Sequence, residues 1–189
     1  MVPTKVDIGF VVGHLPGNTA TSDFGNILAY IQSLARRFDI GPNSIMPGLV
    51  TYGENADVSI PLGAIRSRSD ISKFLGIKSP EQGSNIKEAL TKVSGELFSP
   101  SKGARPNAAR TVYLFLGYSQ IASLDIDNEL ATLKQNGVKI VAVVYGGEIS
   151  EDELDQLKDT VDTVYISSID TPDPDEVLMR ELTNNAAPG

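Results

Sequence analysis

Val6-Asp7-Ile8-Gly9-Phe10-Val11-Val12 is an almost continuous apolar run, and Gly13-His14-Leu15-Pro16-Gly17 follows it directly. A short apolar run that ends in turn residues is typical of a β-strand buried on both faces of a sheet. The run Thr111-Val112-Tyr113-Leu114-Phe115-Leu116 has the same character and leads into Gly117-Tyr118-Ser119. In open α/β sheets, ligands bind beyond the carboxyl ends of the strands. Neither strand end offers a carboxylate, so we expect that no cation is held at this edge of the sheet.

Strand and helix patterns alternate along the rest of the chain. Apolar residues recur at helical spacing over residues 24–38, and Gly41-Pro42 ends that helix. Residues 45–52 and 58–62 predict two short strands, joined as a hairpin across Gly53-Glu54-Asn55. Further helices are expected over residues 70–75, 86–97, 126–133, 151–157 and 177–182, and further strands over residues 138–145 and 164–169.

The order strand, helix, hairpin and then alternating helix and strand predicts the fold class. We expect an α/β fold with a Rossmann-like, doubly wound, mostly parallel central sheet, one antiparallel edge strand and helices on both faces. Ser150 and Glu153 have the spacing of a capping box at the start of one of these helices. Because the apolar pattern continues from end to end, we expect a single domain over residues 1–189, with an ordered core over about residues 5–184.

The composition disfavours several classes of partner and excludes some chemistry. The net charge of -8 disfavours nucleic acid and anionic membranes as partners, since both need clusters of basic residues. The chain contains no cysteine, which excludes disulfides, thiolate metal sites and cysteine nucleophiles. No apolar run is long enough to cross a bilayer, and none resembles a signal peptide. If the natural protein is secreted, we therefore expect this chain to be a processed or excised piece of it.

Five local strings, spread over nearly the whole chain, carry a resemblance to one known family. In chain order they are Val6-Asp7-Ile8-Gly9-Phe10-Val11-Val12, Phe38-Asp39-Ile40-Gly41-Pro42, Val50-Thr51-Tyr52-Gly53, Gly103-Ala104-Arg105-Pro106 and Leu133-Lys134-Gln135-Asn136-Gly137-Val138-Lys139-Ile140-Val141-Ala142-Val143. Together with the order of the predicted elements, they resemble a von Willebrand factor type A domain. The resemblance implies a Rossmann-like fold and, in most members, adhesion or matrix interaction outside the cell.

Many members of that family hold a divalent cation in a metal-ion-dependent adhesion site. The site consists of an Asp-x-Ser-x-Ser loop, a threonine on a second loop and an aspartate on a third. The resemblance puts Gly13, Leu15, Gly17, Ser84 and Gly117 at these positions. Only one hydroxyl and no carboxylate remain, and Mg²⁺ needs anionic oxygen ligands to compensate for its dehydration. The resemblance therefore implies a degenerate site without metal.

The predicted topology gathers one set of loop residues at the carboxyl ends of the strands, and we call this set the strand-end rim. We predict that it is the partner-binding surface, because loops on a rigid scaffold commonly carry recognition. Its members are Gly13, His14, Leu15, Gly17, Asn18, Ser84, Asn85, Gly117, Tyr118 and Ser119.

Several residues of the strand-end rim also have a purely structural interpretation. His14, the only histidine, is a candidate ligand or pH-sensitive contact, but an exposed loop residue is the favoured interpretation. For Ser84, a helix N-cap is favoured over a remnant of the metal site. Tyr118 is either an anchor for a partner or a residue that packs over the adjacent loop, and both interpretations stay open.

Other motifs fit catalysis and calcium binding poorly. The loop after the first strand lacks both G-x-x-x-x-G-K-[ST] and G-x-G-x-x-G, so we interpret its glycines as a flexible connection rather than a phosphate site. No G-x-S-x-G elbow of a hydrolase occurs. Acidic residues cluster over residues 148–155 and 170–176, where predicted helices begin and the helix dipole favours negative charge, without calcium-loop spacing.

These observations lead to one hypothesis and two alternatives. We expect a non-enzymatic, secreted interaction module of the extracellular matrix, which binds collagen or another matrix protein without a metal or other cofactor. The choice of collagen rests on the family resemblance, and neighbouring A domains in a longer chain are further candidate partners. The first alternative is a divalent-cation-dependent adhesion domain whose ions bind elsewhere. The second is a nucleotide-using α/β enzyme.

Overall fold

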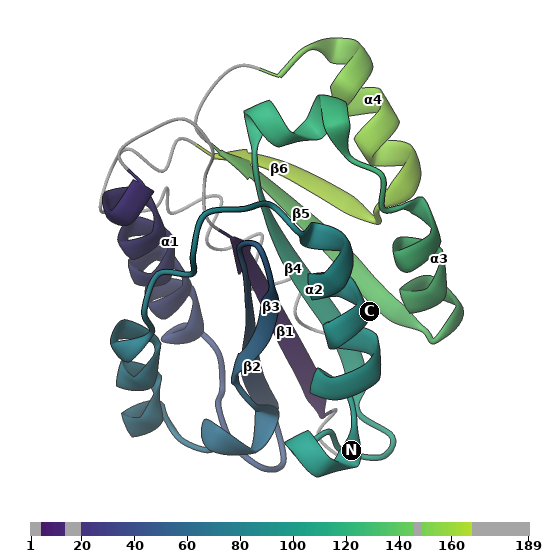
Figure 1. Ribbon diagram of the computed structural model, residues 1–189. Helices are drawn as coiled ribbons and strands as arrows, with labels where there is room; N and C mark the ends of the chain where they lie inside the picture. Colours follow the sequence, from purple (N-terminus) through teal and green to yellow (C-terminus); the bar gives the residue numbers. More distant parts are fainter. Residues whose placement is uncertain (1–4, 14–19, 146–148, 168–189) are drawn as a thin grey trace.

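The computed structural model describes residues 5–13, 20–145 and 149–167 of the chain, which form a layered α/β structure (Figure 1). Six strands form one sheet in the order β3-β2-β1-β4-β5-β6. Their bounds are β1 (Val6–Gly13), β2 (Ile45–Tyr52), β3 (Ala56–Ile60), β4 (Ala109–Gly117), β5 (Val138–Tyr145) and β6 (Thr163–Ser167). All neighbouring strands pair in parallel except β3, which runs antiparallel to β2 at one edge. The predicted fold class is confirmed.

Helical segments cover both faces of the sheet. The α-helices are α1 (Ala20–Ala35), α2 (Ile86–Lys92), α3 (Asp127–Gln135) and α4 (Glu151–Thr160). Short 3₁₀ segments are η1 (Leu62–Ala64), η2 (Arg68–Gly76), η4 (Pro100–Lys102) and η5 (Tyr118–Ser123), and the π-helical segment η3 (Val93–Leu97) continues α2. The helices α1 and η2 lie on one face, whereas α2, α3 and α4 lie on the other (Figure 1).

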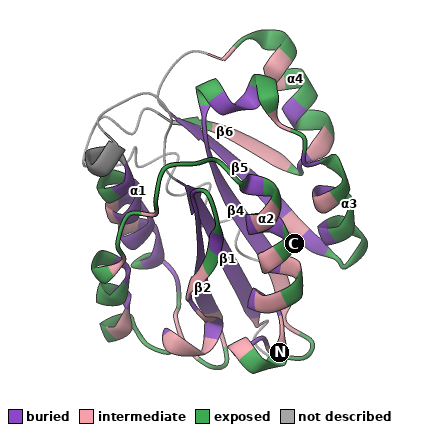
Figure 2. Ribbon diagram, viewed as in Figure 1, coloured by how far each residue is buried: buried purple, intermediate pink, exposed green. Residues whose placement is uncertain are grey.

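The core consists of two apolar layers, one on each face of the sheet. The central strands β1 and β4 are buried on both faces (Figure 2), as their continuous apolar sequences predicted. Phe10 lies at the centre of the layer below α1, where its ring contacts Phe38, Phe74, Tyr113 and Phe115. Val11, the next residue of β1, points into the opposite layer with α2 and α3. Such alternation fixes the register of β1, because a slip by one residue would exchange the two layers.

Most predicted elements occur where the sequence places them, with differences at their ends. The strand predicted over residues 138–145 matches β5, and the Ser150–Glu153 capping box is present. The β3 strand lies two residues earlier than predicted, because Gly53 N donates to Asn55 O (2.9 Å) and closes the hairpin turn before Ala56. The helix predicted over residues 86–97 changes to π-helical hydrogen bonding after Lys92. The helix predicted over residues 177–182 lies outside the described residues.

A buried ion pair joins three segments at the amino end of the sheet. Asp7 on β1 is fully buried, and its Oδ1 accepts from Arg105 Nε (2.8 Å) while its Oδ2 accepts from the Arg105 backbone N (2.8 Å). The same guanidinium donates to Val6 O (2.7 Å) and to Pro42 O (2.9 Å). Arg105 therefore ties the start of β1 to the α1–β2 connection and to the loop before β4.

Removal of this guanidinium should destabilise the fold strongly. Arg105→Met leaves the Asp7 carboxylate buried without its counter-charge, and we expect the free energy of unfolding in urea to fall by about 3–5 kcal/mol. The control is Lys92→Met, which breaks the partly exposed Lys92–Glu96 pair (2.7 Å) and should change stability far less. Losses of equal size in the two variants would contradict the role given to Arg105.

Candidate functional site

The structure brings the described part of the strand-end rim together at the carboxyl ends of β1 and β4. Gly13 and Gly117 are the last residues of these strands, and Tyr118 and Ser119 begin η5. Ser84 and Asn85 immediately precede α2. The other predicted rim residues, His14, Leu15, Gly17 and Asn18, lie outside the described residues.

The side chain of Tyr52 covers Gly13. These two residues are register partners in the parallel pairing of β1 with β2. A Cβ atom added at Gly13 would overlap the Cε2 and Cζ atoms of the Tyr52 ring. The ring is fully buried, and its hydroxyl donates to Phe115 O (3.4 Å). Any side chain at position 13 would therefore have to displace this ring.

The Tyr52 hydroxyl stays neutral in the fold. Burial raises the pKa of Tyr52 well above its usual range, and a side-chain hydrogen bond with Gln120 opposes this rise to a smaller extent. Where the family resemblance puts the first metal-binding aspartate, the structure thus has a glycine under an uncharged aromatic ring.

Gln120 connects two of the rim loops. Its side chain is 4% exposed, its Oε1 accepts from Gly117 N (2.8 Å), and its Nε2 donates to Ser84 Oγ (2.7 Å). A neutral amide therefore bridges the end of β4 and the loop before α2. Gln120 was not among the residues predicted for the rim, although a Gln three positions after Gly117 has the spacing with which a helix N3 side chain reaches back to the N-cap backbone.

The prediction that Ser84 caps α2 is wrong. The cap is Asn85, whose Oδ1 accepts from Glu88 N (3.2 Å). Asn85 is placed there by the hairpin, because its backbone N donates to Gly53 O (2.9 Å) and its Nδ2 to Glu54 O (3.2 Å). The helix begins at Ile86 as expected, but its cap lies one residue later than predicted, and the Ser84 hydroxyl accepts from Gln120 instead.

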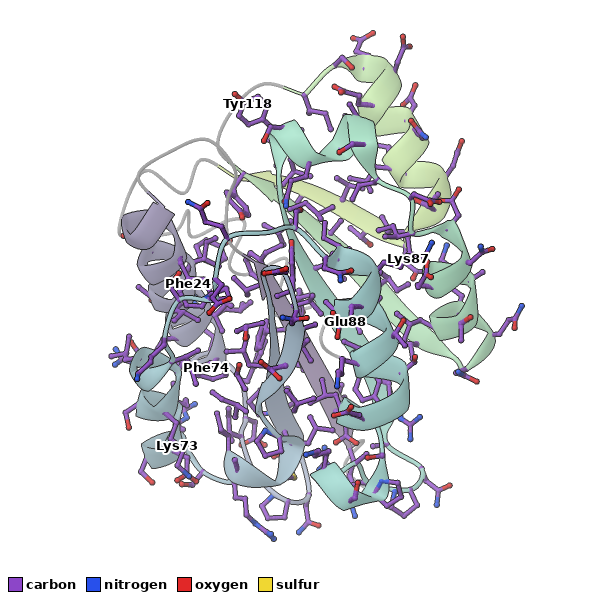
Figure 3. The ribbon with its side chains drawn as sticks, in the orientation of Figure 1. Phe24, Lys73, Phe74, Lys87, Glu88 and Tyr118 are labelled. Atoms are coloured by element: carbon purple, nitrogen blue, oxygen red, sulfur yellow. The ribbon has the colours of Figure 1, made fainter. Side chains whose placement is uncertain are left out.

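Close backbone packing holds the loop before α2 against the β2–β3 hairpin turn. A Cβ atom on Gly53 would overlap the carbonyl of Glu81, and one on Gly83 would overlap the backbone of Glu54. Gly83 also has a φ of 142°, which favours glycine. Glu88 (Figure 3) adds a side-chain contact, since its Oε2 accepts from Ala56 N (3.3 Å).

Tyr118 is the largest exposed side chain of the described rim. It is 44% exposed at the start of η5 and is labelled in Figure 3. A cavity of about 270 Å³ lies between the start of α2 and η5, with Ser84 and Gln120 among its lining residues. At its other end, Lys87 Nζ lies 3.5 Å from Asp125 Oδ2. The rim therefore offers an aromatic side chain and neutral hydrogen-bonding groups rather than a concentration of charge.

The acidic sets have the structural role that the sequence indicated, as far as they are described. Glu151, Asp152 and Glu153 form the first turn of α4, and the hydrogen bonds from the Ser150 hydroxyl and backbone N–H hold the pKa of Glu153 below its usual range. The set at residues 170–176 lies outside the described residues. Within the described ranges, no group of three or more His, Cys, Asp or Glu side chains could hold a metal ion, and no helix is long and apolar enough to cross a membrane.

Comparison with known proteins gives the chain a family. The family model of the von Willebrand factor type A domain matches residues 10–176. The human collagen alpha-6(VI) chain is 29% identical over 150 residues, which are 78% of this chain and 6% of that protein. Human integrin alpha-10 is 25% identical over 187 residues, which are 98% of this chain and 15% of that protein. Human matrilin-1 is 29% identical over 138 residues, which are 71% of this chain and 27% of that protein. The chain thus spans only a small part of the length of these matrix and adhesion proteins.

Solved structures agree on the fold. Proximal thread matrix protein 1 from the mussel byssus, in a structure described as having a zinc-occupied MIDAS motif, superimposes with a TM-score of 0.75 at 20% identity, covering 98% of this chain and 47% of that chain. A von Willebrand factor type A protein from Catenulispora acidiphila gives a TM-score of 0.67 at 13% identity, covering 98% and 42% of the two chains. With the family model matched over most of the sequence, the resemblance seen in the sequence is confirmed: the chain belongs to the von Willebrand factor type A domain family.

Proposed function

We propose that this chain is a non-enzymatic, extracellular interaction module of a matrix or adhesion protein, which binds collagen or another matrix protein without a metal ion at its strand-end rim. Its relatives among collagens and matrilins support the extracellular and protein-binding part of this proposal. The observation that carries the metal-independent part is the Tyr52 ring, which covers Gly13 at the end of β1.

The described rim residues do not fit a divalent cation. Gly13 and Gly117 bring no side-chain oxygen, and the Ser84 hydroxyl is already bonded to Gln120. A single neutral oxygen does not compensate for the dehydration of Mg²⁺, which requires near-octahedral oxygen ligands with anionic members. We infer that the rim meets its partner through direct contacts.

The rim has the properties of a pre-organised protein-binding surface. Gln120, Asn85 and the close glycine contacts hold the loop before α2 against the end of β4 and the hairpin turn, so this part of the rim loses little conformational entropy when a partner binds. Tyr118 projects from this rigid base, and exposed tyrosines contribute a large share of the binding energy at many interfaces. Of the two interpretations of Tyr118, we infer the one in which its side chain anchors a partner rather than packing over the adjacent loop.

Binding to immobilised collagen tests this proposal. We expect Tyr118→Ala to weaken the binding of the chain, measured by surface plasmon resonance, by about tenfold or more. The matched control is Leu75→Ala, which truncates another exposed apolar residue on η2 and should leave the affinity unchanged.

The same binding measurement in an excess of chelator separates the proposal from its alternatives. Unchanged affinity supports direct contact, whereas loss of binding supports a cation-dependent adhesion domain with ions bound elsewhere. Equal losses in Tyr118→Ala and Leu75→Ala would contradict the role of Tyr118 as an anchor.

A double-mutant cycle tests the contact that excludes a side chain from position 13. Gly13→Ala should lower the free energy of unfolding by about 1–3 kcal/mol, because the added methyl group must displace the Tyr52 ring. In a Tyr52→Leu background, the loss of unfolding free energy caused by Gly13→Ala should be smaller by about 0.5–3 kcal/mol. Gly95→Ala is the control, since a Cβ atom there would meet nothing within 4 Å. Strict additivity of the Gly13 and Tyr52 changes would show that the ring does not occupy this space.

A further inference from the structure

A large polar groove runs beside the β2–β3 hairpin, and it shares no residue with the strand-end rim. We call it the hairpin groove. Its volume is about 630 Å³, within the range of clefts that bind drug-sized ligands. One side is the hairpin itself, and the other is the connection from η2 to α2. Its lining residues are Thr51, Glu54, Asn55, Asp57, Ser59, Gly76, Ile77, Lys78, Ser79, Pro80 and Glu81.

The walls of the hairpin groove are held in place from both ends. At one end, the contact of Gly53 with the Glu81 carbonyl and the bond from Asn85 N to Gly53 O (2.9 Å) pin the connection to the hairpin turn. At the other end, the connection leaves η2 next to Phe74, which is fully buried in the core (Figure 3). The groove is therefore a feature of the folded chain that exists before any partner binds.

The floor of the groove is hydrophilic. Thr51 is 6% exposed, and its hydroxyl lies 2.6 Å from the hydroxyl of Ser59 on the neighbouring strand. These hydroxyls retain capacity to accept hydrogen bonds, because each oxygen has two lone pairs. An apolar occupant would leave them without water, so the floor favours an occupant that carries hydrogen-bond donors.

The excess of negative charge in the groove favours an occupant with positive charge. Glu54, Asp57 and Glu81 contribute three exposed carboxylates to the lining, against the single ammonium group of Lys78. In the part of the chain that the structure describes, no ion pair joins any of these four side chains. Guanidinium and ammonium groups are the side chains that pair with carboxylates and donate several hydrogen bonds at once.

We propose that the hairpin groove is a second docking surface of this module and that it takes an extended segment of a partner protein bearing Arg or Lys side chains. The segment lies between the hairpin and the η2–α2 connection, with its cationic groups paired to Glu54, Asp57 and Glu81. This surface extends the proposed function, since a module with two separate surfaces can contact two matrix chains or two parts of one chain.

A charge-matched pair of variants tests the proposal on the intact chain. The probe is a fluorescein-labelled Ser/Gly peptide with arginine at alternate positions, and its affinity is measured by fluorescence anisotropy. The triple variant Glu54→Gln/Asp57→Asn/Glu81→Gln should bind it at least about tenfold more weakly than the unmodified chain. The control Asp152→Asn/Asp155→Asn/Asp159→Asn removes the same charge from exposed positions on α4 and should change the affinity less than about twofold.

Further readouts separate a specific site from general attraction to an acidic protein. The same peptide with citrulline in place of arginine should not bind, and amide NMR shifts caused by the arginine peptide should concentrate in residues 51–59 and 76–81. Unchanged melting temperatures will show that both triple variants are folded. Equal losses of affinity in the two variants, or shifts spread over α4 as strongly as over the hairpin, would overturn the proposal. Tyr118→Ala should leave peptide binding intact, so failure of the rim proposal and failure of this one are distinguishable.

Discussion

The contact between the Tyr52 ring and Gly13 is the constraint on which the character of the strand-end rim depends. Parallel pairing brings the two residues side by side at the ends of β2 and β1, and the ring fills the volume that a side chain at position 13 would need. The ring is buried and its hydroxyl is uncharged, so it adds no ligand for a cation. The side-chain amide of Gln120 completes this arrangement, because its Oε1 accepts from Gly117 N and its Nε2 donates to Ser84 Oγ. Neutral hydrogen bonds thereby join the end of β4 to the loop before α2.

The amino and carboxyl ends of the parallel strands differ in the charges of the residues that surround them. At the amino end, Asp7 and Arg105 form a buried ion pair whose hydrogen bonds reach the α1–β2 connection. At the carboxyl end, the described rim residues are uncharged. At the amino end, the charged side chains of Asp7 and Arg105 stabilise the fold. At the carboxyl end, where we expect a partner to bind, Tyr118 and neutral polar groups are exposed. The hairpin groove, by contrast, is lined by charged side chains, since Glu54, Asp57 and Glu81 contribute three carboxylates and Lys78 one ammonium group.

The sequence was sufficient for features that depend on local pattern. The continuous apolar run over residues 138–145 correctly predicted β5, and the spacing of Ser150 and Glu153 correctly predicted a capping box. Each of these signals is carried by residues that lie close together in the sequence. The hairpin of β2 and β3 was likewise recognised, although β3 begins two residues earlier than expected. The family resemblance, carried by five strings across the chain, was confirmed by the family model.

The hydrogen bonds that fix the arrangement of the described rim residues could not be predicted from local sequence patterns. Gln120 bonds to Ser84 across 36 positions of sequence, and the Tyr52 hydroxyl bonds to Phe115 across 63. Only the pairing of the strands brings these residues together. The capping error at Ser84 has the same origin, because the backbone bond between Asn85 and Gly53 decides where α2 begins. Likewise, nothing local in the sequence links Asp7 to Arg105, which are separated by 98 positions.

A crystal structure of the chain grown in the presence of manganese, with anomalous scattering recorded at the manganese edge, tests whether the strand-end rim holds a divalent cation. We expect no anomalous peak among Gly13, Ser84 and Gly117, with the Tyr52 ring over Gly13 and the Gln120 amide between Gly117 N and Ser84 Oγ. An ordered manganese ion bound to Ser84 Oγ, with the Gln120 amide displaced, would contradict this expectation.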